Sequence, residues 1–199
     1  MKSQGERKTQ KSRTNSSLTP DSEGLRDYIL QATLNMVARH GIAATTYRMV
    51  AREAGVSLGA ISHYFTDKQD LCHQAFTLFA DLSVQQFAQY FAQAQTPQQA
   101  RDSYIHVLIS TAQDARETAL GTELYALSLR SVEYRNIAQD WTHRCRLIMG
   151  QYFDAPTVAI LDAFYEGVIL HQRMSLGEYP VETISMAVQR IAPVDSVDL

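Results

Sequence analysis

Small and hydroxyl-bearing residues between Thr46 and Phe65, in the run TYRMVAREAGVSLGAISHYF, have the types and spacing that suit contact with a DNA groove. Thr46 and Ser57 stand where two short helices would begin, and there a hydroxyl group and free backbone N–H groups can together hold a phosphate. Gly59 would let the backbone approach DNA closely. Ser62 and His63 could then reach base edges.

Such chemistry requires a helix-turn-helix, and the hydrophobic residues around Gly55 fall where that motif needs them. The glycine can take the left-handed conformation that turns the chain, and Ser57 can cap the second helix. An ordinary antiparallel helix pair is the alternative, but the second helix is short and polar where a core helix would be apolar. The residues that would pack the two helices together are Val50, Ala51, Ala54, Val56 and Ile61.

The run from Arg26 to Leu71 resembles the DNA-binding domain of TetR-family transcriptional regulators. The resemblance rests on RDYILQATLNMVARHG, the Thr45-Thr46 pair, Gly55-Val56-Ser57-x-Gly59-Ala60-Ile61, and His63-Tyr64-Phe65-x-x-Lys68 with Leu71. It implies phosphate and groove contacts by Thr45 or Thr46, by the recognition turn and by Lys68. The chain departs from the family at Ser62, where the family often has tyrosine.

The second short helix has no Arg, Asn or Gln for bidentate base reading, so we expect much of the specificity to come from DNA shape and dimer spacing. For Tyr64, packing against the first helix is the alternative to DNA contact. The full set of predicted DNA contacts is Thr45, Thr46, Arg48, Ser57, Leu58, Gly59, Ala60, Ser62, His63, Tyr64 and Lys68.

The charge distribution divides the chain at about residue 68. Residues 1–68 hold ten Lys and Arg against six Asp and Glu, a net +4, and residues 69–199 hold eight against fifteen, a net −7. A basic front suggests that only this part approaches phosphate. We therefore predict three parts: a disordered basic arm over 1–18, a helix-turn-helix domain over 19–68, and an effector-binding and dimerisation domain over 69–199. The arm either follows the DNA backbone or is an inert tail.

Helical periodicity runs from Thr19 onward with no strand pattern, which predicts an all-α fold. The resemblance implies that this fold is TetR-like. Thr19-Pro20 looks like a helix start and Gly41 like a stop. Further helices are expected over 68–93, 97–115, 122–130, 134–152, 156–174 and 181–191.

Residues in the rear half also resemble the RcdA type of TetR regulator, in Leu124-Tyr125-Ala126-Leu127 and Asp162-Ala163-Phe164-x-Glu166-Gly167-x-x-Leu170-His171. Family likeness implies a small-molecule effector between these helices, with Tyr104, Tyr125, Trp141 and His171 as candidates; core packing is the commoner role for each. It also implies a homodimer through the last two helices, at Leu161, Phe164, Val168, Ile184 and Val188. A monomeric core would show a similar excess of apolar residues.

Other classes of function find little support in the sequence. No Gly-rich phosphate loop, Gly-x-Ser-x-Gly elbow or His-Glu-x-x-His is present, so we expect no enzyme activity and no cofactor. His143 and Cys145 point apart on one helix, and no metal site is expected. No apolar run spans a bilayer and the N-terminus lacks a signal-peptide pattern, which favours a cytoplasmic protein without a membrane role.

The leading hypothesis is therefore a homodimeric DNA-binding regulator, more often a repressor in this family, that reads a palindromic double-stranded operator and is released by a small molecule. One alternative is a regulator without an effector. Another is a small-molecule binding protein or enzyme whose helix-turn-helix no longer reads specific DNA.

Overall fold

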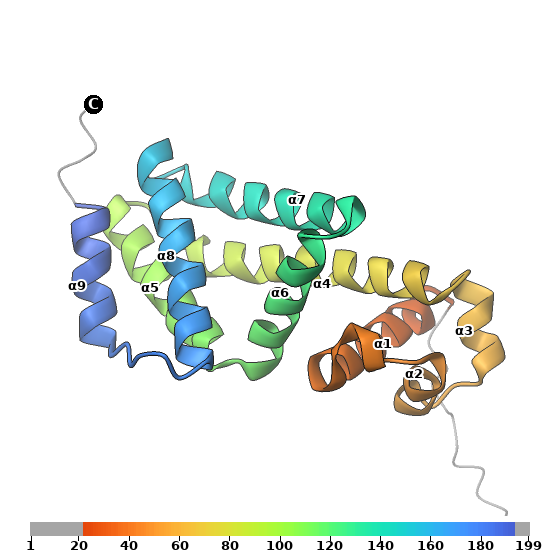
Figure 1. Cartoon of the computed structure of the whole chain (residues 1–199). Coiled ribbons are helices and arrows are strands. Elements are labelled where there is room, and N and C mark those ends of the chain that lie inside the picture. Colours follow the sequence, from red (N-terminus) through yellow and green to blue (C-terminus); the bar gives the residue numbers. More distant parts are fainter. Residues whose placement is uncertain (1–21, 194–199) are drawn as a thin grey trace, which may run out of the picture.

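The computed structural model describes residues 22–193, which form nine helices and contain no strand (Figure 1). The arm over 1–18 and the predicted start at Thr19-Pro20 lie outside these residues. None of the helices in this part of the chain is long and apolar enough to cross a membrane. The helices are α1 (Ser22–Ala44), α2 (Tyr47–Ala54), α3 (Leu58–Tyr64), α4 (Lys68–Phe91), α5 (Pro97–Gln113), α6 (Ala115–Ser128), α7 (Val132–Met149), α8 (Ala155–Arg173) and α9 (Val181–Ile191).

Most helices begin at a Ser, Thr or Asp whose side chain accepts a hydrogen bond from a backbone N–H of the first turn. Thr96 and Asp154 do so for α5 and α8, and each is followed within two residues by a proline. Proline costs nothing there, since a first-turn N–H has no partner within the helix. The predicted stop at Gly41 is a kink within α1, where φ is 75° and the backbone leaves the helical conformation.

The boundary between α5 and α6 differs from the prediction of helices over 97–115 and 122–130. Asp114 is extended, ends α5, and accepts hydrogen bonds from the N–H groups of Arg116 and Glu117 at 2.9 and 3.0 Å. Helix α6 therefore starts seven residues earlier than expected, at Ala115. Helical periodicity continues across the break, so only the capping ability of Asp114 could have indicated it.

The buried side chains form two clusters joined by α4, which runs between the two ends of the molecule (Figure 1). The front cluster combines α1 to α3 and the first half of α4 with Leu120 and Leu124 of α6 and Tyr134 of α7. The rear cluster joins the end of α4 to α5, α8 and α9. Hydrophobic packing at the front thus crosses the domain boundary predicted at residue 68.

Candidate DNA-binding surface and ligand cavity

The turn between α2 and α3 has the predicted geometry. Gly55 is left-handed with φ 62°, and the N–H of Val56 reaches back to the carbonyl of Ala51 at 3.0 Å. Thr46 and Ser57 cap the two helices, their hydroxyl oxygens accepting from the N–H groups of Met49 at 3.3 Å and Ala60 at 3.1 Å. These bonds fix where each helix starts, and therefore how α3 leaves the turn.

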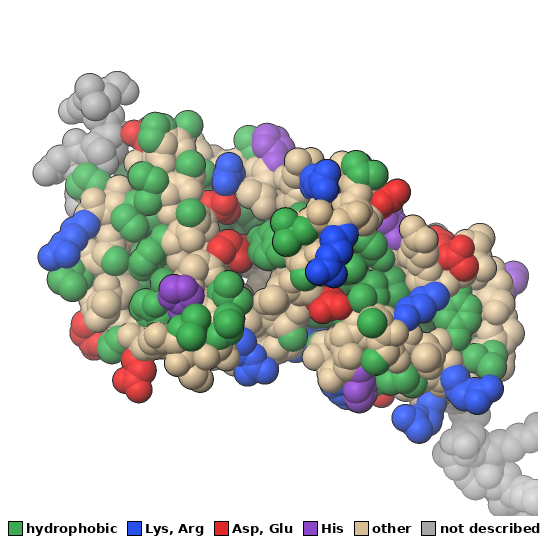
Figure 2. All heavy atoms as spheres, viewed as in Figure 1, with side chains coloured by type: hydrophobic (Ala, Val, Ile, Leu, Met, Phe, Trp, Pro, Cys, Tyr) green, Lys and Arg blue, Asp and Glu red, His purple; other side chains and the backbone are tan. Residues whose placement is uncertain are grey.

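Helix α3 buries one side and exposes the other. Ile61 is fully buried against Val50 and Ala51, whereas Leu58 is 45% exposed. Exposed residues on the outer side are Ser57, Leu58, Gly59, Ser62 and His63. Exposed Arg48 and Arg52 lie on α2, and Figure 2 shows Lys and Arg side chains at this end of the molecule. A short polar helix thus stands clear of the molecule's interior, which a groove-reading helix requires.

Other predicted DNA contacts are placed differently. Thr45 is 1% exposed and its hydroxyl donates to the carbonyl of Gly41 at 2.9 Å, so this group is used inside the fold and not at the surface. Ala60 and Tyr64 are half-buried. Lys68 donates from Nζ to the carbonyl of Ala43 at 3.2 Å, which ties the start of α4 to the end of α1. Thr46 is the exposed threonine of the pair.

A cavity of about 280 Å³ lies among α4 to α8. Its apolar lining is largely aromatic, and two of the rings, Tyr125 and Trp141, stack 5.7 Å apart with an interplanar angle of 19°. The surface is hollowed between α6 and α8, with acidic side chains beside the hollow (Figure 2). The aromatic residues that line the cavity are Phe79, Phe87, Tyr104, Tyr125, Trp141 and Tyr165.

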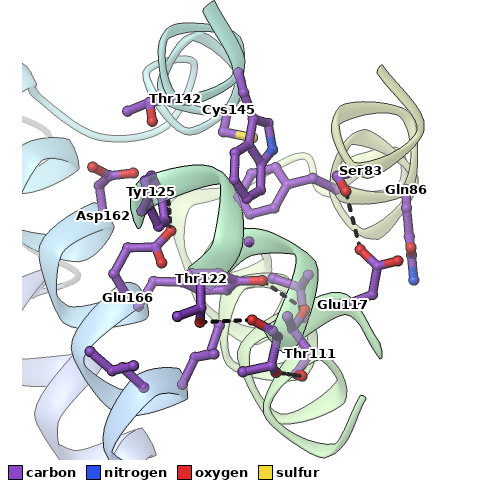
Figure 3. Close-up of a pocket in the computed structure, with 18 of the residues that line it drawn as sticks. Ser83, Gln86, Thr111, Glu117, Thr122, Tyr125, Thr142, Cys145, Asp162 and Glu166 are labelled. Carbon is purple, nitrogen blue, oxygen red and sulfur yellow. Dashed lines mark hydrogen bonds between the residues drawn. The ribbon is translucent and has the colours of Figure 1, made fainter. Parts of the chain in front are cut away.

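Three carboxylates also line the cavity, and they differ in their partners (Figure 3). Glu117 of α6 lies 3.2 Å from Arg116 and accepts from the hydroxyl of Ser83 at 3.2 Å. Asp162 of α8 is held by Arg146 of α7 at 2.7 Å. Glu166 of α8 accepts from the hydroxyl of Tyr125 at 2.8 Å and pairs with no cation in the described part of the chain.

Burial sets the ionisation of the acidic groups. It raises the pKa of Glu166 to about 7; the Tyr125 hydrogen bond acts in the opposite direction and the charge of Asp162 in the same direction. Burial also raises the pKa of Glu117, against the effects of the Ser83 bond and Arg116. A buried carboxylate without a cation is costly to ionise, and a cation in the cavity would lower that cost.

The structure brings three of the four predicted effector residues together. Tyr104, Tyr125 and Trp141 all line the cavity, and Tyr104 also donates to the carbonyl of Leu161 at 2.7 Å. His171 lies apart from them: it is exposed, and its Nδ1 lies 2.9 Å from the hydroxyl of Tyr179, outside the cavity.

Helix α6 lies between the cavity and the helix-turn-helix. Its inner side supplies Glu117 and Tyr125 to the cavity lining. On its other side, Arg116 donates to Asn35 at 2.9 Å and to Gln31 at 3.0 Å, both on α1. Glu123 accepts from the backbone N–H of Ile42 at 2.9 Å, next to the kink at Gly41. A shift of α6 would therefore move α1.

Comparison with known proteins places this architecture in a family. The family model for bacterial regulatory proteins of the tetR family matches residues 29–75. The solved structure of SCO7518 from Streptomyces coelicolor A3(2), described as a transcriptional regulator, is 32% identical with a TM-score of 0.77, covering 85% of this chain and 98% of that one. The chain belongs to the TetR family.

Two further matches extend the comparison. The transcriptional regulator BetI of Agrobacterium fabrum is 31% identical over 123 residues, 61% of this chain and 59% of that protein. The first curated relatives are matched over 59% of their own length or less. The multidrug binding protein EbrR, solved with imidazole, is 25% identical with a TM-score of 0.72, covering 91% of this chain and 97% of that one; it was also solved with ethidium and with proflavin.

The residues predicted for a TetR-type dimer contact are mostly in the chain's own core. Leu161, Val168, Ile184 and Val188 are between 0 and 3% exposed, so in the single chain they pack inside the rear cluster and not at its surface. Phe164 is half-buried and its role stays a prediction. The prediction used the apolar stripes of α8 and α9 that in fact pack against α5, because periodicity alone does not tell which stripe faces which neighbour.

The cavity carboxylates of this TetR protein were not predicted from the sequence. Asp162 and Glu166 are spaced i, i+4 and so share one side of a helix, and both lie within the stretch that resembles the RcdA type. Two acidic residues on an otherwise apolar helix face are a usable signal for a binding site. Glu117 and Ser83 come from distant segments, and no local pattern relates them.

Proposed function

We propose that this chain is a DNA-binding transcription regulator, a repressor, that binds a palindromic operator as a homodimer and is released by a small-molecule effector. One observation carries the proposal: α3 exposes its polar side to solvent while Ile61 anchors it from within, and a lined cavity lies on the other side of α6. Reading and sensing elements are thus separate but mechanically adjacent.

DNA binding is supported by the exposed groups around the turn. The hydroxyl of Thr46 and the start of α2 offer donors to phosphate, and Arg48 adds charge beside them. Leu58 and Ser62 on the outer side of α3 could contact thymine methyl groups and base edges. A single seven-residue helix reads few base pairs, so useful specificity requires a second copy.

Dimerisation is supported by apolar side chains left exposed on and between α8 and α9. Ile160 and Met174 are 54% and 57% exposed on or next to α8, and Met186 is 46% exposed on α9. Leu176 and Val181, between and at the start of these helices, are 62% and 49% exposed. Large apolar residues gathered at one end of a molecule mark an interaction surface. Packing two copies through it would form a two-fold contact.

Release by an effector is supported by the position of α6. A molecule that fills the cavity presses on Tyr125 and Gly121, and the opposite side of the same helix is bonded to α1 by Arg116 and Glu123. A displaced α1 changes the separation of the two α3 helices in a dimer. Operator DNA fixes that separation at about 34–36 Å or a related spacing, so a mismatch weakens binding.

Selection of bound fragments from random double-stranded DNA with the purified protein tests the proposal. We expect an inverted repeat whose half-sites are about one helical turn apart, with a preference that persists as salt is raised. Recovery of no common sequence, or only of fragments bound weakly and uniformly, would contradict it. Recovery of a single half-site would support sequence-specific DNA binding and contradict binding to a palindrome.

The dimer surface has its own test. Ile160→Glu together with Met186→Glu should convert the dimer to a monomer in sedimentation experiments, because each places a charge in an apolar contact. The matched control is Leu129→Glu, since Leu129 is 80% exposed at the end of α6 and away from α8 and α9. A dimer that survives the double change would exclude this surface.

A further inference from the structure

The charges around the cavity do not balance. Three carboxylates line it, and no Lys, Arg or His of the described residues does so. Glu117 and Asp162 have arginine partners, Arg116 and Arg146, whereas Glu166 has only the hydroxyl of Tyr125. One acidic group therefore remains without a counter-ion beside an aromatic space.

We propose that the cavity takes an organic cation with an apolar body, and that Glu166 is its counter-ion. The inference deepens the proposed function, on which it rests for the role of the ligand as effector. In Figure 3, Asp162 and Glu166 come from α8 on one side of the cavity, and Glu117 and Ser83 lie across from them. A positive group beside Glu166 would have a carboxylate as partner and a second acidic residue nearby.

The aromatic lining suits such a cation in a second way. The stacked pair Tyr125 and Trp141 lies beside Glu166, since Tyr125 touches both. An aromatic face attracts an ammonium group or other cation within about 6 Å of the ring centre. The apolar body of the ligand would contact Phe79, Phe87 and Met149. A ligand with one positive charge and an apolar body therefore matches this lining.

Anionic and strongly polar ligands fit this site badly. An anion would meet Glu166 with no cation to hold it, and entry into a low-dielectric space would increase the repulsion. A strongly polar ligand would lose water around many polar groups against a lining whose surface is mostly apolar. The cavity of about 280 Å³ is at the small end for ligand sites and limits the body to a small molecule.

Fluorescence titration of the full chain with proflavin, without DNA, tests the inference. We expect binding that 4-phenylbutylamine displaces and that 4-phenylbutanoate, the same skeleton with the opposite charge, does not displace at tenfold higher concentration. Glu166→Gln keeps the size and the acceptor for Tyr125 but removes the charge. It should weaken proflavin binding about tenfold or more, the typical size of a lost charge-assisted contact.

The control is Glu178→Gln, which makes the same change in net charge at an exposed residue outside the cavity. It should leave the affinity unchanged, and the thermal midpoint of Glu166→Gln must stay at or above that of the parent. Unchanged proflavin affinity in Glu166→Gln would overturn the proposal, as would equal displacement by the amine and the acid.

The assay contains no DNA, so its failure is distinct from failure of the proposed function. If the protein reads an operator and 4-phenylbutanoate releases it, the proposed regulatory function stands and the proposal of a cationic ligand fails. If the protein binds proflavin through Glu166 but selects no DNA, the cationic ligand stands and the regulatory function fails.

Discussion

The helix-turn-helix and the ligand cavity are built in opposite ways. The turn, both caps and the reading side of α3 come from twenty consecutive residues, Thr46 to Phe65, and the hydrogen bonds that shape the turn and the caps are local. The cavity draws its lining from five helices between Phe79 and Leu170. A local motif keeps its geometry while the surrounding sequence changes, whereas a site built from distant segments depends on how whole helices pack. A substitution that alters only the local turn should therefore leave the cavity intact.

The largest effect should come from Gly55→Val, which we expect to lower operator affinity about a hundredfold while proflavin binding persists. A Cβ at this position would meet nothing within 4 Å, so the change tests only the left-handed backbone at φ 62°. Strain of this kind costs about 1–3 kcal/mol for a β-branched residue. Fluorescence anisotropy with a selected operator measures the loss.

Gly55→Asn is the matched control, because asparagine tolerates the left-handed conformation. It should keep most of the operator affinity. If the valine variant binds specific DNA as tightly as the asparagine variant, the turn does not set the position of α3.

The converse experiment fills the cavity. A Cβ at Gly121 would lie 3.5 Å from the ring of Trp141, an ordinary contact, so Gly121→Ala should be tolerated and Gly121→Leu should occupy ligand space. We expect at least a tenfold loss of proflavin affinity in the leucine variant and a smaller loss in the alanine variant. By the release mechanism proposed above, a leucine that fills the cavity presses on α6 as an effector would, so operator affinity should fall as well in this variant and stay near the parent value in the alanine variant. Unchanged operator affinity in a leucine variant that no longer binds proflavin would show that filling the cavity does not affect DNA binding.

A smaller effect is expected from pH. Burial raises the pKa of Glu166 to about 7, so the carboxyl is largely protonated at pH 6 and ionised at pH 8. A permanently charged ligand, benzyltrimethylammonium, should therefore bind several-fold more tightly at pH 8 when measured by calorimetry. Besides burial, Tyr125 of α6 and Asp162, the partner of Arg146, act on the pKa of Glu166. The charge of Glu166 in turn helps to raise the pKa of Cys145, Tyr104 and Tyr165.

The same group makes stability depend on pH in the opposite sense. Its pKa is higher in the folded chain than its usual value of 4.5, so the folded state holds more protons between these values. Stability without ligand should fall as pH rises from about 5 through 7. Glu166→Gln should reduce the dependence of ligand affinity on pH and the dependence of stability on pH. A ligand affinity that is independent of pH in the parent would place the cation elsewhere in the cavity.

The smallest effect is expected from a change in α3, Gly59→Ala, which should alter operator affinity and stability in opposite directions. The Cβ in Gly59→Ala would lie 3.7 Å from Oγ of Ser57, so the fold accepts it, and the higher helix propensity of alanine should add up to about 1 kcal/mol to stability. Operator affinity should fall a few-fold, because the methyl group keeps the backbone from DNA. Denaturant unfolding and anisotropy measure the two changes, and higher stability with unchanged affinity would remove Gly59 from the interface.

Sequence patterns predicted the front of the molecule well because its determinants are short-range. A glycine four residues after Ala51, a capping Ser57 and an apolar Ile61 suffice to define the turn. Such patterns do not predict which of two similar residues the packing of helices buries. Thr45 and Thr46 are indistinguishable by type, yet one is buried and the other exposed.

At the rear, helix existence was predictable and side-chain orientation was not. Leu170 lines the cavity and His171, rotated by about 100° around the same helix, does not. Because periodicity does not tell which neighbour a helix side faces, Leu161 and Val168 were predicted at a dimer contact. Partners such as Ser83 and Glu117, 34 residues apart, meet only once the helices are packed.

The front hydrophobic cluster has a consequence for how the chain melts. Leu120, Leu124 and Tyr134 complete the interior beneath α1 to α3, so these three helices have no closed core of their own. Heating should therefore give one cooperative transition in which α1 to α3 and the helices around the cavity unfold together. A bound ligand should protect α1 to α3 against proteolysis. The DNA-reading part of this protein is defined by its contacts with residues far along the chain.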